Sequence, residues 1–311
     1  MHAPRTVLRQ PTDPVRGVGL FSARPASLSF LPGDARGRIT LRRIDAGHTA
    51  STAPAHIAAL HTNAAWAALP PAFPIRNTTL AASHADTPAQ RAADASAHIF
   101  ATVEHVLSAL AGLGVWDAFI HLHDACEVPI LDGSALPFVE ALRPHLVRPA
   151  HDPGASAEPT PLSLRAPVEV RAGDASIRAE PAPEIDYTYA LDYGPASPLP
   201  PQQARWTGDP DDYAANIAPA RTFSLRAEAH AARAAGLFAH LSPRDMLVVG
   251  DDGAPIDNAW RMPHEPARHK LLDLIGDLAL LGAPLHARVV AHRSGHALTH
   301  EFCRAVLAAA R

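Results

Sequence analysis

The sequence predicts an α+β fold in two domains, and three features of the chain support this. A length of 311 residues exceeds what one small core needs and suits two domains of ordinary size. Strand-like and helix-like segments are mixed without the strict alternation that marks a parallel doubly wound sheet. Residues 148–161 are rich in proline and small residues and have no periodic apolar pattern. We therefore expect domains at 1–147 and 162–311, joined by a linker.

The first domain is predicted to place one long helix between short strands. Short strands with turns are predicted over 18–33 and 37–47, where apolar and polar residues alternate. Residues 97–114 carry apolar side chains at helical spacing and predict a helix that ends at a glycine. A strand is then predicted over 115–123, and the segment 126–142 is predicted to be a loop that runs into a helix.

The second domain is predicted to begin with strands and to end with a helix. Its predicted segments are antiparallel strands over 167–173, 176–183 and 185–193, helical segments around a break over 210–238, a strand with a turn over 245–257, the clearest helix of the chain over 266–281, and a strand, a glycine turn and a terminal helix over 287–310.

The composition is that of a globular protein and argues against several classes of function. Hydrophobic residues make up 47% of the chain and charged residues 19%. A net charge of −4 without a basic tract argues against a nucleic-acid partner. No segment approaches the roughly 20 apolar residues of a membrane helix, and residues 1–20 lack the apolar run of a secretory signal. Two cysteines predict no disulfide framework. We expect a cytoplasmic protein.

The helix predicted over 266–281 carries a polar stripe on an otherwise apolar surface. His269, Asp273 and Asp277 are spaced four residues apart, so their side chains lie on one face, one turn apart. A buried carboxylate is costly unless it is paired or binds a metal. His269 and Asp273 can hold one metal ion together, and Asp277 can either bind the metal or orient a ligand. The alternative is a solvated helix face.

A second pair of residues completes a catalytic metal site. Glu104 and His105 are adjacent in another apolar segment, so His105 can supply a third ligand while Glu104 stays next to the metal. Three protein ligands, one open position and a neighbouring carboxylate are typical of catalytic zinc sites. Taken alone, an acidic residue beside a histidine is commonplace.

Three further residues are candidates for the same site. His296 follows a glycine in a turn and can donate a proton to a leaving amine. The hydroxyl of Thr222 can donate to a developing oxyanion. Lys270 is the only lysine in a chain that otherwise uses arginine, which indicates a position that needs a compact ammonium group. A surface histidine and a helix-capping threonine are the plain alternatives.

Several distinctive motifs are spread over nearly the whole chain. They are GVGL at 17–20, TVEHVLSALAGLGVWDAFIHLHDACEVPILDGSALPFV at 102–139, ARTF at 220–223, RHKLLDLIGDLALLG at 268–282 and RSGHAL at 293–298. Together, and in this order, they resemble one enzyme family, the UDP-3-O-acyl-N-acetylglucosamine deacetylases of lipid A synthesis.

The resemblance implies a function and a set of residue roles. Each domain would layer helices against a small β-sheet, with the active site between the domains. The reaction would be zinc-dependent hydrolysis of an acetamide, and ferrous iron is hard to tell from zinc on these ligands. The implied roles are His105, His269 and Asp273 as metal ligands, Glu104 as general base, His296 as general acid, Thr222 as oxyanion donor, Lys270 as active-site lysine, Asp277 as orienting partner and Phe223 as a substrate-binding residue.

Some positions depart from the family pattern. Phe21 stands where the family usually has histidine, and Ser224 and Leu225 follow RTF in place of Gly-Phe. The family's Gly-Gly turn is absent near 237–243, and the family's HALN motif is HALT here, ending in Thr299. These differences leave two alternatives open: a divergent zinc deacetylase with another N-acetylated sugar as substrate, or a non-catalytic binding protein. We further expect a monomer whose partner is an acylated UDP-sugar, with transient contact to its lipid-like part.

Overall fold

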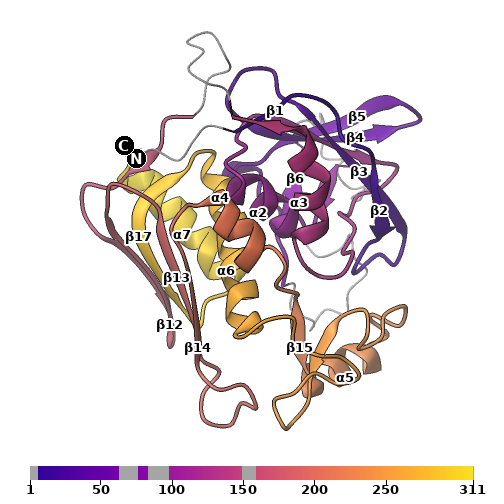
Figure 1. Ribbon diagram of the computed structural model, residues 1–311, viewed down its shortest axis with the longest axis vertical. Coiled ribbons are helices and arrows are strands. Elements are labelled where there is room, and N and C mark those ends of the chain that lie inside the picture. The colour runs from indigo at the N-terminus through magenta and orange to yellow at the C-terminus, as the bar shows by residue number, and fades with distance from the viewer. Residues whose placement is uncertain (1–5, 63–75, 83–97, 149–158, 311) are drawn as a thin grey trace.

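Two β-sheets flank a central layer of helices in the computed structural model of this chain (Figure 1). The structure describes residues 6–62, 76–82, 98–148 and 159–310. Its mixture of several small sheets with helices confirms the predicted α+β class. Residues 149–158 of the predicted linker lie outside the described residues, so the division into two domains stays a prediction.

The first large sheet has five strands in the order β2-β3-β8-β4-β5. All neighbours are antiparallel except β4 and β8. Buried and half-buried residues alternate along β8, so one face of the sheet packs on the core. The strands are β2 (Val15–Val18), β3 (Pro25–Pro32), β8 (Ala118–His123), β4 (Ile39–Asp45) and β5 (His48–Pro54).

The second large sheet has the order β11-β12-β17-β13-β14, and the short β10 also pairs with β17. The three expected strands β11, β12 and β13 are present and alternate in direction, but β12 and β13 are not neighbours. Strand β17 inserts between them, antiparallel to β12 and parallel to β13. The strands are β10 (Leu162–Ser163), β11 (Val168–Ala172), β12 (Ala175–Pro181), β13 (Asp186–Leu191), β14 (Gln202–Trp206) and β17 (Leu285–His292).

The helices between the sheets carry most of the motifs on which the family resemblance rests. Helix α6 contacts α2 on one side and α7, β13 and β14 on the other. One continuous apolar core runs through both sheets and these helices. The helices are α2 (Glu104–Gly112), α3 (Leu136–Leu142), α4 (Pro210–Asp212) with a π-helix over Tyr213–Ile217, α6 (Glu265–Leu278) and α7 (His296–Ala309), with 3-10 turns at Ile57–Ala59, Arg143–His145 and Ala279–Leu281.

Three two-stranded sheets complete the described part of the fold. Strands β15 and β16, together with α5, form a lobe that lies away from the two large sheets (Figure 1). The other two pairs are β1 with β9 and β6 with β7. The elements are β1 (Val7–Leu8), β9 (Leu146–Val147), β6 (Thr79–Ala81), β7 (Ile99–Ala101), β15 (Phe223–Leu225), α5 (Arg226–Ala234) and β16 (Leu247–Val249).

The structure corrects three predicted boundaries. The helix expected over 97–114 is a strand followed by a helix, because β7 pairs with β6 and Thr102 has a positive φ of 58°. A positive φ is unfavourable for a β-branched residue and interrupts a right-handed helix. Within the helical region expected over 210–238, residues 223–225 form strand β15, which pairs with β16. Helix α6 begins one residue earlier than expected and tightens into a 3-10 turn over its last residues.

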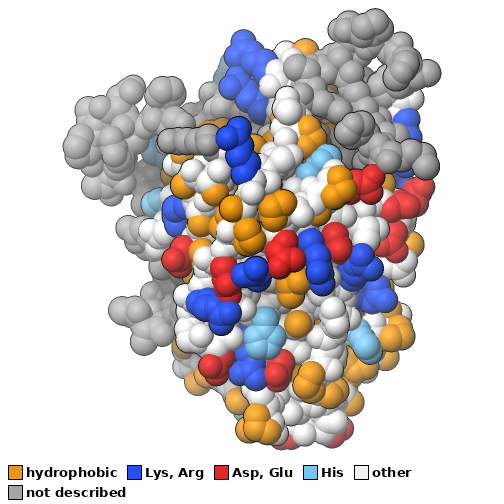
Figure 2. Space-filling model, turned by 90° about the vertical axis from the view of Figure 1, so that its left-hand side faces the viewer, with side chains coloured by type: hydrophobic (Ala, Val, Ile, Leu, Met, Phe, Trp, Pro, Cys, Tyr) orange, Lys and Arg blue, Asp and Glu red, His pale blue; other side chains and the backbone are white. Residues whose placement is uncertain are grey.

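Acidic and basic side chains are mixed on the side of the molecule that carries the second large sheet (Figure 2). Arg178 pairs with both Glu169 and Glu180, and Arg205 pairs with Asp186. Such alternation leaves no broad surface of one charge among the described residues of this sheet. In the part of the chain that the structure describes, no helix combines the length and apolar character needed to cross a membrane.

Candidate metal centre and active site

The polar stripe of α6 is buried in the centre of the molecule. His269, Asp273 and Asp277 are 1%, 6% and 1% exposed, which contradicts the alternative of a solvated helix face. Buried ionisable groups of this kind need partners, because water no longer stabilises their charged forms. The stripe therefore indicates a buried polar site within the helix layer.

A glycine on α6 allows α2 to bring its own polar residues to this stripe. A Cβ atom at Gly276 would lie 2.0 Å from the carbonyl oxygen of Glu104, so only glycine permits the observed distance between the helices. This close approach places His105 opposite His269 and Asp273. Helix packing, rather than a loop, thus assembles the site from two distant segments.

Three side chains form a group that can hold a metal ion. One ligand atom from each of His105, His269 and Asp273 lies within 4.8 Å of the others. Nε2 of His105 is 3.5 Å and Nε2 of His269 is 3.3 Å from Oδ1 of Asp273. That oxygen is buried and has no hydrogen-bond partner, as expected for an atom reserved for a metal. The residues present therefore fit a metal ion.

The charges around this group favour metal binding. Burial lowers the pKa of His269 to about 3, so its ring is neutral. Its Nδ1 lies 3.1 Å from the carbonyl of Ala220 and donates to it, which leaves Nε2 free to bind a metal. Burial alone would raise the pKa of Asp273, but its polar neighbours, among them the ammonium of Lys270 at 2.9 Å, outweigh burial and hold that pKa well below its usual value. Asp273 is therefore ionised.

Glu104 lies at the first turn of α2 beside the metal group. Its Oε2 accepts a hydrogen bond of 2.9 Å from the backbone N–H of Thr78. Burial raises the pKa of Glu104, and the charges of His296 and His105 offset this only in part. A carboxylate with a raised pKa is suited to taking up a proton near neutral pH.

His296 and Asp277 form a hydrogen-bonded pair at the other end of the stripe. Nδ1 of His296 is 2.8 Å from Oδ2 of Asp277, and Nε2 of His296 points towards Asp273 at 3.8 Å. Burial alone would lower the pKa of His296, but the charge of Asp277 and its hydrogen bond raise it to about 9. The imidazole is therefore a cation at neutral pH and can give up a proton from Nε2.

The remaining predicted residues surround the metal group. Nζ of Lys270 lies 2.9 Å from Oδ2 of Asp273, the carboxylate oxygen that faces away from the two histidines. The ring centroid of Phe223 lies 6.5 Å from the ring centroid of His269. Thr222 precedes β15, and its neighbour Arg221 is held by Glu265 at 2.8 Å in a buried ion pair. The structure thus gathers the other eight predicted residues around α6, and Thr222 lies in the chain between Ala220 and Phe223, which both contact His269.

Sequence reasoning missed several residues that support the site. Thr78 lies 26 residues before Glu104, at no spacing that a helix or strand pattern would reveal. His300 lies one helical turn after His296, so helical spacing was a usable signal for it. Both are buried and both contact the Asp277 region.

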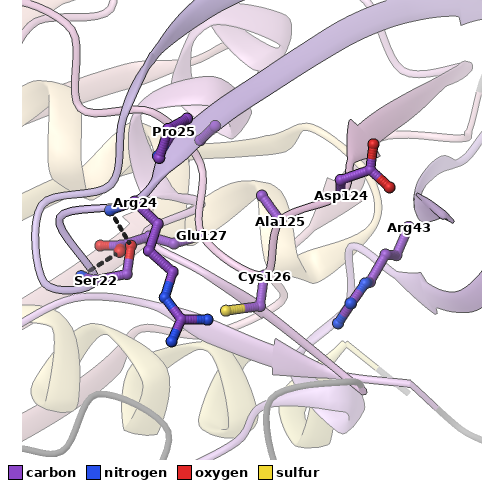
Figure 3. A pocket seen from close by; sticks show the side chains of 9 residues that line it. Ser22, Arg24, Pro25, Arg43, Asp124, Ala125, Cys126 and Glu127 are labelled. Carbon is purple, nitrogen blue, oxygen red and sulfur yellow. Dashed lines mark hydrogen bonds between the residues drawn. The ribbon is translucent and has the colours of Figure 1, made fainter. Parts of the chain in front are cut away.

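Glu127 is a further buried residue that the sequence analysis passed over. Its carboxylate accepts hydrogen bonds from the backbone N–H groups of Phe21 and Ser22 and from the hydroxyl of Thr102. Figure 3 shows Glu127 and Ser22 side by side in a small pocket. This carboxylate fixes the loop after β2 to Thr102, two positions before the start of α2.

Two segments in which the chain differs from the family pattern contact each other. The ring centroid of Phe21 lies 5.5 Å from that of Phe238, in the segment where the Gly-Gly turn is absent. The contact joins the loop after β2 to the segment after α5. Aromatic contacts of this geometry stabilise a pair beyond simple burial.

The close approach at Gly276 leads to a prediction. Gly276→Ala should lower the thermal midpoint by several degrees and reduce both bound metal and turnover, because α2 must move away from α6 and carry His105 with it. Thermal unfolding and metal content of the purified variant measure this. A variant with an unchanged thermal midpoint, metal content and rate would show that α2 and α6 can accommodate a methyl group at this position.

Three protein ligands leave a coordination position open on a metal such as zinc, and this distinguishes catalytic zinc sites from structural ones. With Glu104 and His296 available for proton transfer beside these ligands, the class of protein indicated is a metal-dependent hydrolase.

Comparison with known proteins identifies the family. The family model described as UDP-3-O-acyl N-acetylglycosamine deacetylase matches residues 5–308. UDP-3-O-acyl-N-acetylglucosamine deacetylases are among the similar curated proteins. That of Anaeromyxobacter sp. (strain Fw109-5) is 35% identical over 94% of this chain and 85% of its own length. The protein of Thermosynechococcus vestitus is 39% identical over 66% of this chain and 68% of its own length. The protein of Geotalea uraniireducens is 32% identical over 94% of this chain and 84% of its own length.

The chain belongs to the UDP-3-O-acyl N-acetylglycosamine deacetylase family. The predicted family is thereby confirmed, and with it the prediction of an amide hydrolase that acts in lipid A biosynthesis.

Proposed function

We propose that this chain hydrolyses the acetamide of UDP-3-O-acyl-N-acetylglucosamine and releases acetate and the free 2-amino sugar. The observation that carries the proposal is the buried His105, His269 and Asp273 group in a chain that the family model matches over residues 5–308. The similar proteins named above act on this compound, as their names state.

We propose zinc as the metal held by His105, His269 and Asp273. Two imidazoles and one carboxylate suit zinc, and ferrous iron accepts the same ligands. When bound there, zinc would supply a Lewis acid able to activate water near neutral pH. Oδ1 of Asp273 and the two Nε2 atoms are the atoms that would bind it.

Glu104 and His296 divide the proton transfers in this proposal. The Thr78 amide occupies Oε2 of Glu104, so Oε1 is the oxygen that takes a proton from the attacking water. His296 donates its Nδ1 proton to Asp277, so Nε2 is the atom that protonates the leaving nitrogen. Asp277 acts by orienting the ring and by keeping it a cation.

Three residues bind or stabilise the substrate in this proposal. The hydroxyl of Thr222 donates to the oxygen on which negative charge develops, where a positioned donor is worth most. The ammonium of Lys270 keeps Asp273 oriented and adds positive charge next to the reacting carbonyl. Phe223, which contacts His269, offers an apolar surface to the sugar or its acyl chain.

One observation favours a second candidate, a deacetylase for a different N-acylated sugar. The contact between Phe21 and Phe238 joins two positions that differ from the family pattern, and both are aromatic. An altered surface at this place would change which acyl chain is accepted while leaving the hydrolytic groups unchanged.

Acetate release by the zinc-loaded protein tests the proposal. The substrates are UDP-3-O-acyl-N-acetylglucosamine with several acyl lengths and the unacylated sugar nucleotide. We expect turnover that requires the 3-O-acyl chain. Turnover that is equal with and without the chain would favour the second candidate, and no turnover on any of them would refute the proposed substrate. The two-domain division, the monomeric state and the cytoplasmic location stay predictions from the sequence.

A further inference from the structure

Thr78 lies between the two groups that transfer protons. It immediately precedes β6 and is 0% exposed. Its backbone N–H donates to Oε2 of Glu104 at 2.9 Å, and its hydroxyl lies 2.5 Å from Oδ1 of Asp277. One residue therefore contacts the base on α2 and the orienting carboxylate on α6.

The hydrogen bonds of the Thr78 hydroxyl have one consistent direction. An ionised carboxylate only accepts, so the single hydroxyl proton points to Oδ1 of Asp277. The hydroxyl oxygen then accepts from Nε2 of His300, 2.9 Å away. His300 is 3.6 Å from Oδ1 of Asp277, too far for a good hydrogen bond of its own. His300 thus orients the Thr78 hydroxyl, while its own charge acts on Asp277 through space.

As a result, each carboxylate oxygen of Asp277 accepts a hydrogen bond from a different donor. Oδ1 accepts from Thr78, and Oδ2 accepts from His296 at 2.8 Å. Burial alone would raise the pKa of Asp277, but His296 and His300 outweigh it and keep that pKa below its usual value. The carboxylate is therefore charged and cannot rotate without losing a hydrogen bond.

We propose that Thr78 is a positioning residue that sets Glu104 and the Asp277–His296 pair relative to each other, and that His300 fixes the direction of its hydroxyl. The proposal rests on the roles given above to Glu104 and His296. Glu104 is on α2 and His296 on α7, two helices that both pack against α6. A displacement of about 1 Å between catalytic groups can cost roughly 100-fold in rate, so a direct link between them matters.

Thr78→Val removes the hydroxyl and keeps both the shape of the side chain and the backbone N–H that Glu104 needs. We expect kcat to fall about tenfold with KM nearly unchanged, since one hydrogen bond to a charged group is lost. Thr78→Ser should restore most of the rate. Thr79→Val is the matched control, because Thr79 is a buried neighbour without a contact to Asp277, and it should keep normal kcat. Normal kcat in Thr78→Val would overturn the proposal.

A double-mutant cycle separates positioning from a general loss of stability. His300→Leu alone should lower kcat less than Thr78→Val does. In a chain that already carries Thr78→Val, His300→Leu should lower kcat by a smaller factor than it does in the wild-type chain, because the hydroxyl that His300 orients is missing. Losses that multiply in the double variant would contradict the proposed route.

A readout that needs no turnover keeps this test apart from the test of the substrate. The imidazole N–H that His296 donates to Asp277 should give a downfield proton NMR signal in the metal-loaded protein. The signal should shift or broaden in Thr78→Val and stay in place in Thr79→Val. An unchanged signal in Thr78→Val would overturn the proposal even if the wild-type chain acted on another substrate.

Discussion

Glu104→Ala should keep the fold and the metal while lowering turnover by roughly 100-fold or more, the usual contribution of a positioned base. Glu104 is not one of the three side chains of the metal group, so its removal leaves those ligands in place. Acetate release and metal content, measured on the same preparation, check both halves of the expectation.

Two further variants sharpen this experiment. Glu104→Gln can still accept the hydrogen bond from Thr78 but cannot take a proton, so its loss should match that of Glu104→Ala. Glu140→Ala changes an exposed acidic residue of α3 and should leave the rate unchanged. If Glu104→Gln turned over substrate at the wild-type rate, Glu104 would not be the base.

His105→Ala should lose the metal and with it all measurable turnover. Two ligands on α6 remain, but catalytic zinc sites use three, and His105 is the one that α2 contributes. The number of metal ions per chain should fall from about one in the wild type to well below one in the variant. The loss should persist when excess zinc is added, whereas a wild-type protein stripped by a chelator should recover with zinc.

His48→Ala provides the control for this second variant. His48 is exposed on β5 and belongs to no metal group among the described residues, so the variant should keep both metal and rate. A His105→Ala protein that still bound stoichiometric metal would exclude His105 as a ligand.

The polar stripe of α6 shows how far local pattern predicts a site. The spacing of His269, Asp273 and Asp277 on one helix face follows from 3.6 residues per turn, which needs no tertiary information. Their burial does not follow from spacing, because a solvated face has the same pattern. Only the packing of α6 between α2 and the second sheet decided between the two interpretations.

The strand within the helix expected over 97–114 shows where local pattern fails. Ile99 has the spacing of a helical residue, yet it pairs with β6 in a sheet. The parallel pairing of β13 with β17 joins segments about a hundred residues apart, and no local pattern records it. Pairing partners of this kind are chosen by tertiary contacts, which override weak local propensities.

The sequence by itself determined the class of fold, the family, and the residues that make up the stripe of α6 and the pair at 104–105. These depend on residue identity and on helical spacing, both of which are local. The tertiary structure decided that Gly276 lets α2 approach, that Thr78 links Glu104 to Asp277, and that Phe21 meets Phe238. Each of these joins residues far apart along the chain, and such contacts exist only once the core has packed the elements together.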